Sequence, residues 1–180
     1  MEIHWEREER LLGTAGSVKR LESYFANCDD FLVVYGDLLT DEDLSALVAA
    51  HRRRAQAMAT LLVHRRLGAN SVLSLDSDQR IIGFVERPPA GFLADTDCWV
   101  NSGLQVLSRG LLARIPSGQV ADLPRDVYIP ALAEEKFYGF PLTGYRCAID
   151  SPERYLEAQQ AVESGRCRVA QRGRRARSVC

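Results

Sequence analysis

The sequence predicts an α/β fold, because short apolar segments of strand length alternate with segments of helical periodicity along its 180 residues. The clearest strand is Phe31–Tyr35, a continuous apolar run of five residues that ends at Gly36. A run without alternation predicts a strand that is buried on both faces in the middle of a parallel sheet. The clearest helix follows at residues 44–51, where apolar side chains recur at helical spacing.

The remaining elements continue this alternation. Ser151-Pro152-Glu153 has the composition of a helix start, with a capping serine, a proline at the first helical position and an acid in the first turn. The small-residue loop at 12–17 leads into a helix and exposes backbone N–H groups to which a ligand can come close. Strands are expected at 58–63, 71–75, 80–85, 99–107, 136–142 and 144–150, and short helices at 108–115 and 124–133.

Composition limits the class of protein. The 46% apolar and 26% charged residues are typical of a globular domain, and no apolar run is long enough to span a bilayer. The five cysteines are scattered, without Cys-x-x-Cys or Cys/His metal spacing. We therefore expect free thiols, a cytoplasmic location, no zinc site and no membrane partner.

The charge is distributed unevenly. Residues 166–180 contain six arginines and no carboxylate. We expect one domain at 1–165, followed by a basic, disordered tail at 166–180. A nucleic-acid-binding function would rest on this tail alone, so no nucleic-acid partner is expected.

Two polar residues in apolar surroundings are candidates for a site. Asp37 follows the apolar strand, and ligands of open α/β sheets bind outside the carboxyl ends of strands; the alternative is that Gly36-Asp37 is only a turn. Asn101 lies within an apolar strand. Such an asparagine either approaches a ligand or satisfies neighbouring backbone groups.

Five motifs in this order resemble those of the sugar-phosphate nucleotidyltransferases, the NDP-sugar pyrophosphorylase family that includes the mannose-1-phosphate guanylyltransferases and the glucose-1-phosphate nucleotidyltransferases. The motifs are Leu12-Gly-Thr-Ala-Gly16, Val34-Tyr-Gly-Asp37, Val85-Glu-Arg-Pro88, Val100-Asn-Ser-Gly103 and Ile149-Asp-Ser-Pro152. The resemblance covers roughly residues 8–163. It implies a three-layer, Rossmann-like (GT-A-like) nucleotidyltransferase fold with a mixed, mostly parallel sheet.

The resemblance also implies an activity, in which a nucleoside monophosphate passes from an NTP to a sugar 1-phosphate and pyrophosphate leaves. Asp37 and Asp150 are then the catalytic residues that bind Mg²⁺, a cation that prefers hard oxygen ligands. One branch of the family would place Ala148 at the second ligand position, and the other branch places Asp150 there.

The other motifs carry binding roles in the family. Gly13, Thr14 and Gly16 are implied to contact the nucleotide, together with Asp37. The sugar phosphate is implied to contact Glu86, Arg87 and Asn101. Arg87 stands where the family has lysine, and the two cations differ in reach and geometry.

One family motif is missing from the sequence. The glycine-rich Gly-Gly-x-Gly-Thr-Arg loop, which cradles the triphosphate in the family, does not occur in these residues. We therefore expect the C-terminal portion of such a domain, truncated at its N-terminus. The alternative to an enzyme is a non-catalytic sugar-phosphate-binding or regulatory subunit of an NDP-sugar pyrophosphorylase, and homo-oligomers are possible in either case. A requirement for Asp37 together with Mg²⁺ would distinguish the enzyme from the binding subunit.

Overall fold

The computed structural model describes residues 2–67, 71–87, 89 and 97–168. The chain forms two compact units, one from residues 1–34 and 44–141 and the other from residues 35–43 and 142–180. Each unit is built around its own sheet. Among the described residues, no helix is long and apolar enough to cross a membrane.

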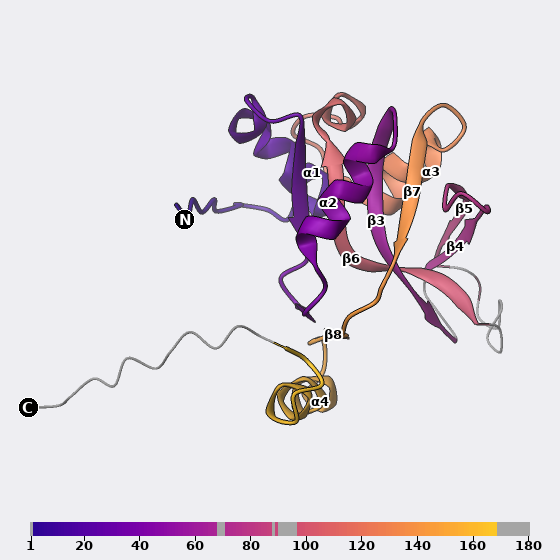
Figure 1. Cartoon of the computed structure of the whole chain (residues 1–180). Helices are drawn as coiled ribbons and strands as arrows, with labels where there is room; N and C mark the ends of the chain where they lie inside the picture. Colours follow the sequence, from indigo (N-terminus) through magenta and orange to yellow (C-terminus); the bar gives the residue numbers. More distant parts are fainter. Residues whose placement is uncertain (1, 68–70, 88, 90–96, 169–180) are drawn as a thin grey trace, which may run out of the picture. The chain divides into compact units, whose positions relative to one another are not determined.

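The first unit contains a six-stranded sheet in the order β5-β4-β6-β3-β7, with β1 paired to β6 (Figure 1). Its longest strand, β6, pairs with β1, β3 and β4. The strands are β1 (Asp30–Val34), β3 (Ala57–Arg66), β4 (Ser71–Leu75), β5 (Ile81–Glu86), β6 (Cys98–Ser108) and β7 (Lys136–Pro141).

The predicted mostly parallel sheet is wrong for the described strands, because β3 and β7 form the one parallel pair among them. The pairs β1–β6, β3–β6, β4–β5 and β4–β6 are antiparallel. The predicted central position of Phe31–Tyr35 is also wrong. Among the described residues β1 pairs with β6 alone, and Leu32 and Val34 are 37% and 51% exposed.

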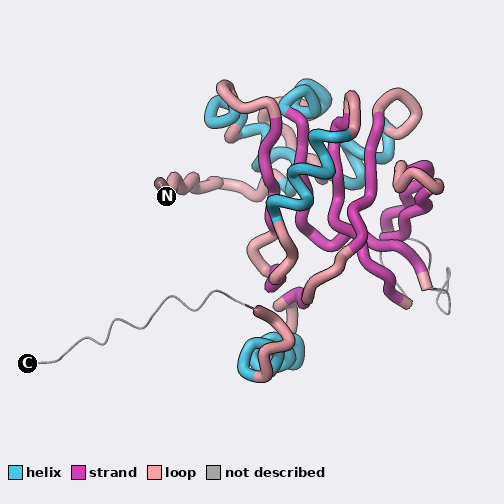
Figure 2. The backbone as a smooth tube through the Cα atoms, in the orientation of Figure 1, coloured by secondary structure: helices cyan, strands magenta, loops and turns pink. Residues whose placement is uncertain are grey.

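Helices cover both faces of this sheet (Figure 2), which gives the three layers that the resemblance implies. On one face, α1, η2 and η3 share a buried core with alternate sheet residues such as Leu61, Phe84 and Phe137. On the other face, α2 contacts β3, and its buried His51 hydrogen-bonds to Thr60. The helices are α1 (Gly13–Arg20), η1 (Glu22–Phe25), α2 (Leu44–Arg53), η2 (Arg109–Arg114), η3 (Leu123–Tyr128) and α3 (Ile129–Ala131).

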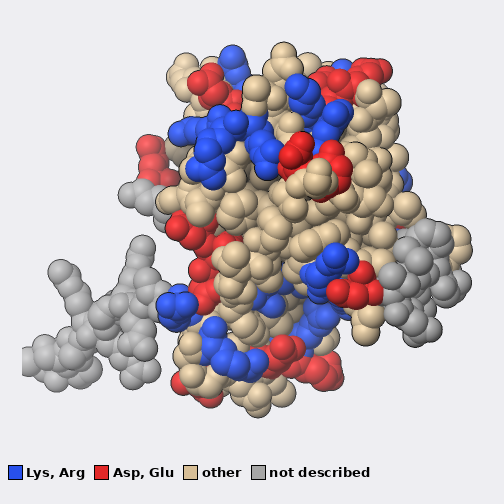
Figure 3. Space-filling view, turned by 45° about the vertical axis from the view of Figure 1, so that its right-hand side comes forward, with Lys and Arg blue, Asp and Glu red and all other residues tan. Residues whose placement is uncertain are grey.

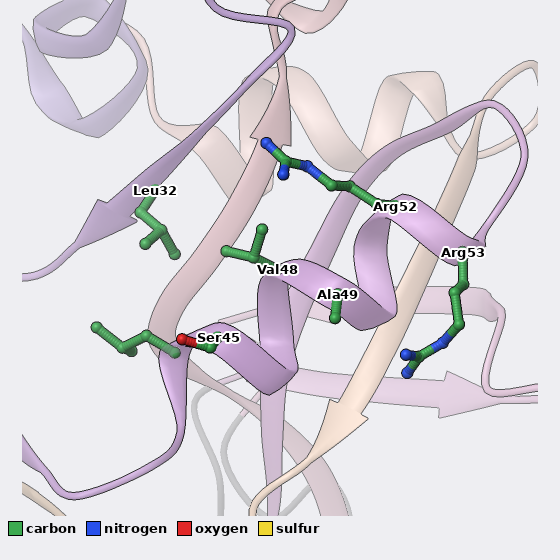
Figure 4. Close-up of a pocket in the computed structure, with 7 residues that line it drawn as sticks. Leu32, Ser45, Val48, Ala49, Arg52 and Arg53 are labelled. Atoms are coloured by element: carbon green, nitrogen blue, oxygen red, sulfur yellow. The ribbon is translucent and has the colours of Figure 1, made fainter.

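An apolar groove of about 610 Å³ lies between β1 and α2 (Figure 4). Leu32 of β1 points toward Val48 of α2, and the arginines at the end of α2 complete the lining. None of the site residues that the sequence predicts lines this groove. We therefore place the candidate site elsewhere.

The second unit contains the two-stranded antiparallel sheet of β2 (Leu38–Thr40) and β8 (Arg146–Ala148), followed by α4 (Pro152–Glu163). The predicted helix start at Ser151 is confirmed, since the Ser151 side chain accepts a hydrogen bond from the Arg154 N–H.

The chain beyond α4 remains packed for a few residues. Cys167 is buried, and its N–H donates to the Ala161 carbonyl at 2.9 Å. The Arg168 N–H donates to the Asp41 carboxylate at 2.8 Å. Residues 166–168 thus belong to the second unit, and the rest of the predicted tail lies outside the described residues.

Charged side chains of both signs are interspersed on the face drawn in Figure 3. A protein that binds nucleic acid along a face usually presents a continuous basic stripe there. The face in Figure 3 does not have this character.

Candidate functional site

A pocket of about 270 Å³ in the first unit collects three of the residues that the sequence predicts for the site, Gly13, Glu86 and Arg87. Its remaining lining comes from the segment that enters η3. We call it the charged pocket and define it by Gly13, Glu86, Arg87, Val120, Ala121, Asp122 and Arg125.

Glu86 ends β5, and its side chain turns into a partly buried position. Its Oε2 atom is buried and has no hydrogen-bond partner among the described residues. Burial raises the pKa of this carboxyl and the charge of Asp122 adds to the effect, while the nearby Ser71 hydroxyl and the guanidinium groups of Arg87 and Arg125 oppose it. The Ser71 hydroxyl, opposite Glu86 in the β4–β5 ladder, is also buried without a partner in the described part of the chain, so a donor to this carboxyl can come from Ser71 or from a ligand hydroxyl.

Glu86→Gln is expected to stabilise the protein at neutral pH. Because the folded-state pKa of Glu86 is raised, its stabilising contribution is complete at low pH and is lost as the pH rises through that pKa. The variant and the wild type should therefore have the same melting temperature near pH 4, and the variant should melt higher at pH 7 to 8. Thermal unfolding across this range measures the difference, with exposed Glu157→Gln as the control. A difference that does not change with pH would contradict the assignment.

The segment 12–16 differs from the open loop that the sequence predicts, because α1 already begins at Gly13. The N–H groups of Ala15 and Gly16 both donate to the Ala121 carbonyl, at 2.9 and 3.2 Å. A Cβ atom at Gly13 would lie 2.5 Å from that same oxygen, and one at Gly16 would lie 2.6 Å from the Gln119 carbonyl. The glycines therefore allow close approach of another backbone segment, and the two N–H groups have internal acceptors.

Thr14 also has internal partners. Its hydroxyl donates to the Asp122 carboxylate at 3.0 Å and accepts from the Leu123 N–H at 2.8 Å. Thr14 and Gly16 do not line the charged pocket, whereas Gly13 does. Their contacts fix the segment 119–123, which forms one wall of that pocket.

Asn101 lies in β6 and does not line the charged pocket. Its Oδ1 atom accepts the N–H of Gly103 at 3.1 Å, and Gly103 has a φ of +82°. The register between β3 and β6 shifts opposite this stretch, between Leu61 and Val63. Of the two interpretations of Asn101, the structure shows the contact with neighbouring backbone.

Asp37 and Asp150 both belong to the second unit, where they follow the same end of the β2–β8 pair. Leu38 pairs with Ala148 in the β2–β8 ladder, and one step beyond it the Ile149 N–H donates to the Asp37 carbonyl at 2.6 Å. Asp150 directly follows Ile149, and both aspartates are exposed. Ala148, the alternative ligand position, is buried and has no side-chain donor atom.

The donor set of this aspartate pair suits Mg²⁺, which commonly binds one or two carboxylates and completes its shell with water and substrate phosphates. The described residues contain no group of three or more His, Cys, Asp or Glu side chains that could hold a metal. Asp150 also forms an ion pair with Arg154, whose Nε lies 3.5 Å from an Asp150 oxygen.

Two acids between β2 and α2, Asp41 and Glu42, hold the segment that enters β8. The buried Glu42 carboxylate accepts the N–H and hydroxyl of Thr143 and the N–H of Gly144, at 2.8 to 2.9 Å. Asp41 accepts the Tyr145 N–H at 2.6 Å, and its backbone hydrogen bonds from Arg168 and Tyr145 lower its pKa. These contacts set the register that places Asp37 next to Ile149.

Sequence reasoning missed Asp122 and Arg125, which line the charged pocket. The local signal was present, because Asp122 precedes the predicted helix start at Pro124 and its side chain accepts the Arg125 N–H. This signal predicts a helix cap. It does not predict that Asp122 and Arg125 lie near Glu86, which is at the end of β5.

Comparison with known proteins gives relatives of one kind. The chain is 29% identical over 173 residues to mannose-1-phosphate guanylyltransferase from Mycobacterium tuberculosis, covering 92% of this chain and 45% of the relative. It is 31% identical over 124 residues to UTP–glucose-1-phosphate uridylyltransferase from Synechocystis, covering 66% of this chain and 31% of the relative. The chain thus spans less than half the length of these two relatives.

A solved structure supports the fold. HddC from Yersinia pseudotuberculosis, in a complex with GMP-PN, superposes with a TM-score of 0.67 at 22% identity, covering 86% of this chain and 64% of HddC. The model of the Nucleotidyl transferase family matches residues 1–165. With more than half of its residues matched, the chain belongs to the Nucleotidyl transferase family.

Proposed function

We propose that this chain acts in the transfer of a nucleoside monophosphate from an NTP to a sugar 1-phosphate, a reaction that yields an NDP-sugar and pyrophosphate. The observation that supports the proposal is the register in which Asp37 lies opposite Ile149, the residue that precedes Asp150. The names of the curated relatives, a guanylyltransferase and a uridylyltransferase of sugar 1-phosphates, support the same class of reaction.

The proposed roles follow from the chemistry of each side chain. Asp37 and Asp150 would hold Mg²⁺, which when bound supplies positive charge to the phosphate oxygens of the substrates. Glu86, with its unpartnered Oε2 atom, accepts hydrogen bonds from sugar hydroxyls. Arg87 lines the same pocket and attracts the phosphate of the sugar.

We propose fewer direct contacts with the nucleotide than the family motif implies. Gly13 lines the charged pocket, so it remains a candidate for direct contact. Thr14 and Gly16 would act through the segment 119–123, to which they are hydrogen-bonded.

Asp37→Asn tests the proposal. Wild-type chain is incubated with Mg²⁺, mannose or glucose 1-phosphate and each common NTP, and pyrophosphate release is measured. The variant is expected to lose about 100-fold or more of this rate, because an amide cannot replace the charge of a carboxylate ligand. Asp78→Asn, an exposed change in the turn between β4 and β5, is the control and should keep full activity. Equal rates in Asp37→Asn and the wild type would contradict the role of Asp37.

A second candidate function is that of a non-catalytic subunit that binds sugar phosphates. It is favoured by the engagement of the Thr14 hydroxyl and the Gly16 N–H in internal hydrogen bonds, since these groups are then not directed to a nucleotide. This function predicts sugar 1-phosphate binding that needs neither Mg²⁺ nor Asp37, without pyrophosphate release from any NTP.

A further inference from the structure

Arg125 belongs to the charged pocket and has no role in the function proposed above. It lies in η3, and its guanidinium is held by a neighbouring carboxylate. Its Nε and Nη2 atoms donate to the two oxygens of Asp126, both at 2.9 Å. This two-point contact fixes the plane of the guanidinium, and among the described residues Nη1 has no hydrogen-bond partner.

Asp126 is itself anchored to the pocket wall. Its Oδ2 atom accepts the Asp122 N–H at 2.7 Å, and its own N–H donates to the Asp122 carbonyl at 2.9 Å. Asp122 in turn accepts the Thr14 hydroxyl and the Arg125 N–H through its side chain. The guanidinium of Arg125 is thus connected to α1 through hydrogen bonds, although it lies on the surface.

The groups that remain for a ligand define its chemistry. Asp122 uses both carboxylate oxygens internally, so the open groups of the pocket are one buried carboxylate oxygen of Glu86 and the guanidinium groups of Arg87 and Arg125. A neutral sugar would offer no anion to the Arg87 guanidinium or to Nη1 of Arg125, the edge of that guanidinium that Asp126 does not use. Inorganic phosphate would offer the guanidinium groups an anion but, being smaller than a sugar phosphate, would fill only part of the pocket. A ligand that carries both hydroxyls and a phosphate satisfies all three groups.

The size of the pocket agrees with this chemistry. Its volume of about 270 Å³ lies just below the range of roughly 300 to 1,000 Å³ that is typical of pockets for drug-sized ligands. A monosaccharide phosphate suits such a volume better than a whole nucleotide sugar.

We propose that Arg125 binds the phosphate of the sugar 1-phosphate in the charged pocket and that Asp126 positions its guanidinium. The proposal rests on the substrate class of the proposed function and adds two residues to it. Arg125 shares the phosphate with Arg87, while Glu86 accepts hydrogen bonds from the sugar.

Ligand-observed NMR titrations test the proposal without turnover. They measure the affinity of the whole chain for mannose 1-phosphate, mannose and inorganic phosphate. Arg125→Gln is expected to weaken mannose 1-phosphate binding about 10- to 100-fold, the range for one charge-assisted hydrogen-bonded contact, and to leave mannose binding unchanged. Arg125→Lys keeps the charge and loses the two-point geometry of the guanidinium. Its affinity for mannose 1-phosphate should lie between those of the wild type and Arg125→Gln. Asp126→Asn should weaken mannose 1-phosphate binding less than Arg125→Gln does.

Arg114→Gln is the matched control, because Arg114 is also a surface arginine held by two carboxylates, those of Glu134 and Glu135, and lies outside the charged pocket. It should bind mannose 1-phosphate like the wild type. Unchanged binding in Arg125→Gln, an equal loss of mannose and mannose 1-phosphate binding, or no preference of the wild type for mannose 1-phosphate would each overturn the proposal.

The binding experiment can succeed or fail whether or not the chain catalyses the proposed reaction. Phosphate-dependent binding that needs Arg125, in a chain that releases no pyrophosphate, supports the inference and speaks against the transferase. Where pyrophosphate is released, Arg125→Gln should raise the KM for the sugar 1-phosphate and leave the KM for the NTP unchanged. Turnover with no change of either KM in Arg125→Gln would leave the transferase standing and overturn the inference.

Discussion

Gly13→Ala is expected to destabilise the protein by about 3 kcal/mol, whereas Gly118→Ala should cost only about 1 kcal/mol. Both glycines have a positive φ, +74° and +70°, so alanine is strained by a similar amount at either position. They differ in their surroundings. The added Cβ at Gly13 would lie 2.5 Å from the Ala121 carbonyl oxygen, and nothing lies within 4 Å of the Cβ at Gly118.

Urea unfolding measures the free energy of unfolding of the wild type and of the two variants. The excess loss in Gly13→Ala reports the clash with the Ala121 backbone, because the conformational strain cancels between the two. Since Ala121 lines the charged pocket, the variant should also bind mannose 1-phosphate more weakly. Equal losses of stability in the two variants would show that segment 12–16 does not pack on residues 119–121 as described.

Glu42→Ala is expected to destabilise the second unit by about 2 to 4 kcal/mol. Its buried carboxylate accepts three hydrogen bonds from Thr143 and Gly144, and hydrogen bonds to charged groups contribute about 1.5 to 3 kcal/mol each. Thr143 and Gly144 are exposed, so water replaces part of what is lost. The net effect is therefore smaller than the sum.

Hydrogen exchange of the amides of residues 143–149 measures this effect locally. Glu42→Ala should speed exchange at Thr143, Gly144 and Ile149, the last because its N–H donates to Asp37 only while β8 stays in register. Glu42→Gln should show a smaller increase, since one acceptor oxygen remains. The exposed Glu157→Ala in α4 should have no effect on these amides, and acceleration there equal to that in Glu42→Ala would argue against a specific role of Glu42.

Local patterns predicted the elements well. The helix start at Ser151 depends on three adjacent residues, and the structure shows the expected cap. The apolar run Phe31–Tyr35 correctly predicted a strand at Asp30–Val34. It did not predict whether this strand pairs on one edge or on both. Five consecutive apolar residues are compatible with a central strand and also with β1, whose Leu32 and Val34 are exposed.

The candidate site was predictable in part. The motifs predicted Glu86, Arg87, Asp37 and Asp150 as site residues. The structure brings Glu86 and Arg87 into one pocket, and it places Asp37 opposite Ile149, the residue before Asp150. The contacts between Thr14 and Asp122 join residues 108 positions apart in the sequence, and no local pattern indicates them. For this reason the glycines of 12–16 were interpreted as a ligand loop, and Arg125 was missed.

Binding of Mn²⁺, a spectroscopic substitute for Mg²⁺, tests most directly whether Asp37 and Asp150 form one metal site. The free ion is measured by electron paramagnetic resonance in titrations of the chain with mannose 1-phosphate present and without an NTP, which would itself chelate the ion. We expect one site, weakened about 10-fold or more in both Asp37→Asn and Asp150→Asn, and unchanged in Asp78→Asn. Equal Mn²⁺ affinity in the wild type and the two variants would contradict the shared site, and with it the proposed role of Asp37 and Asp150.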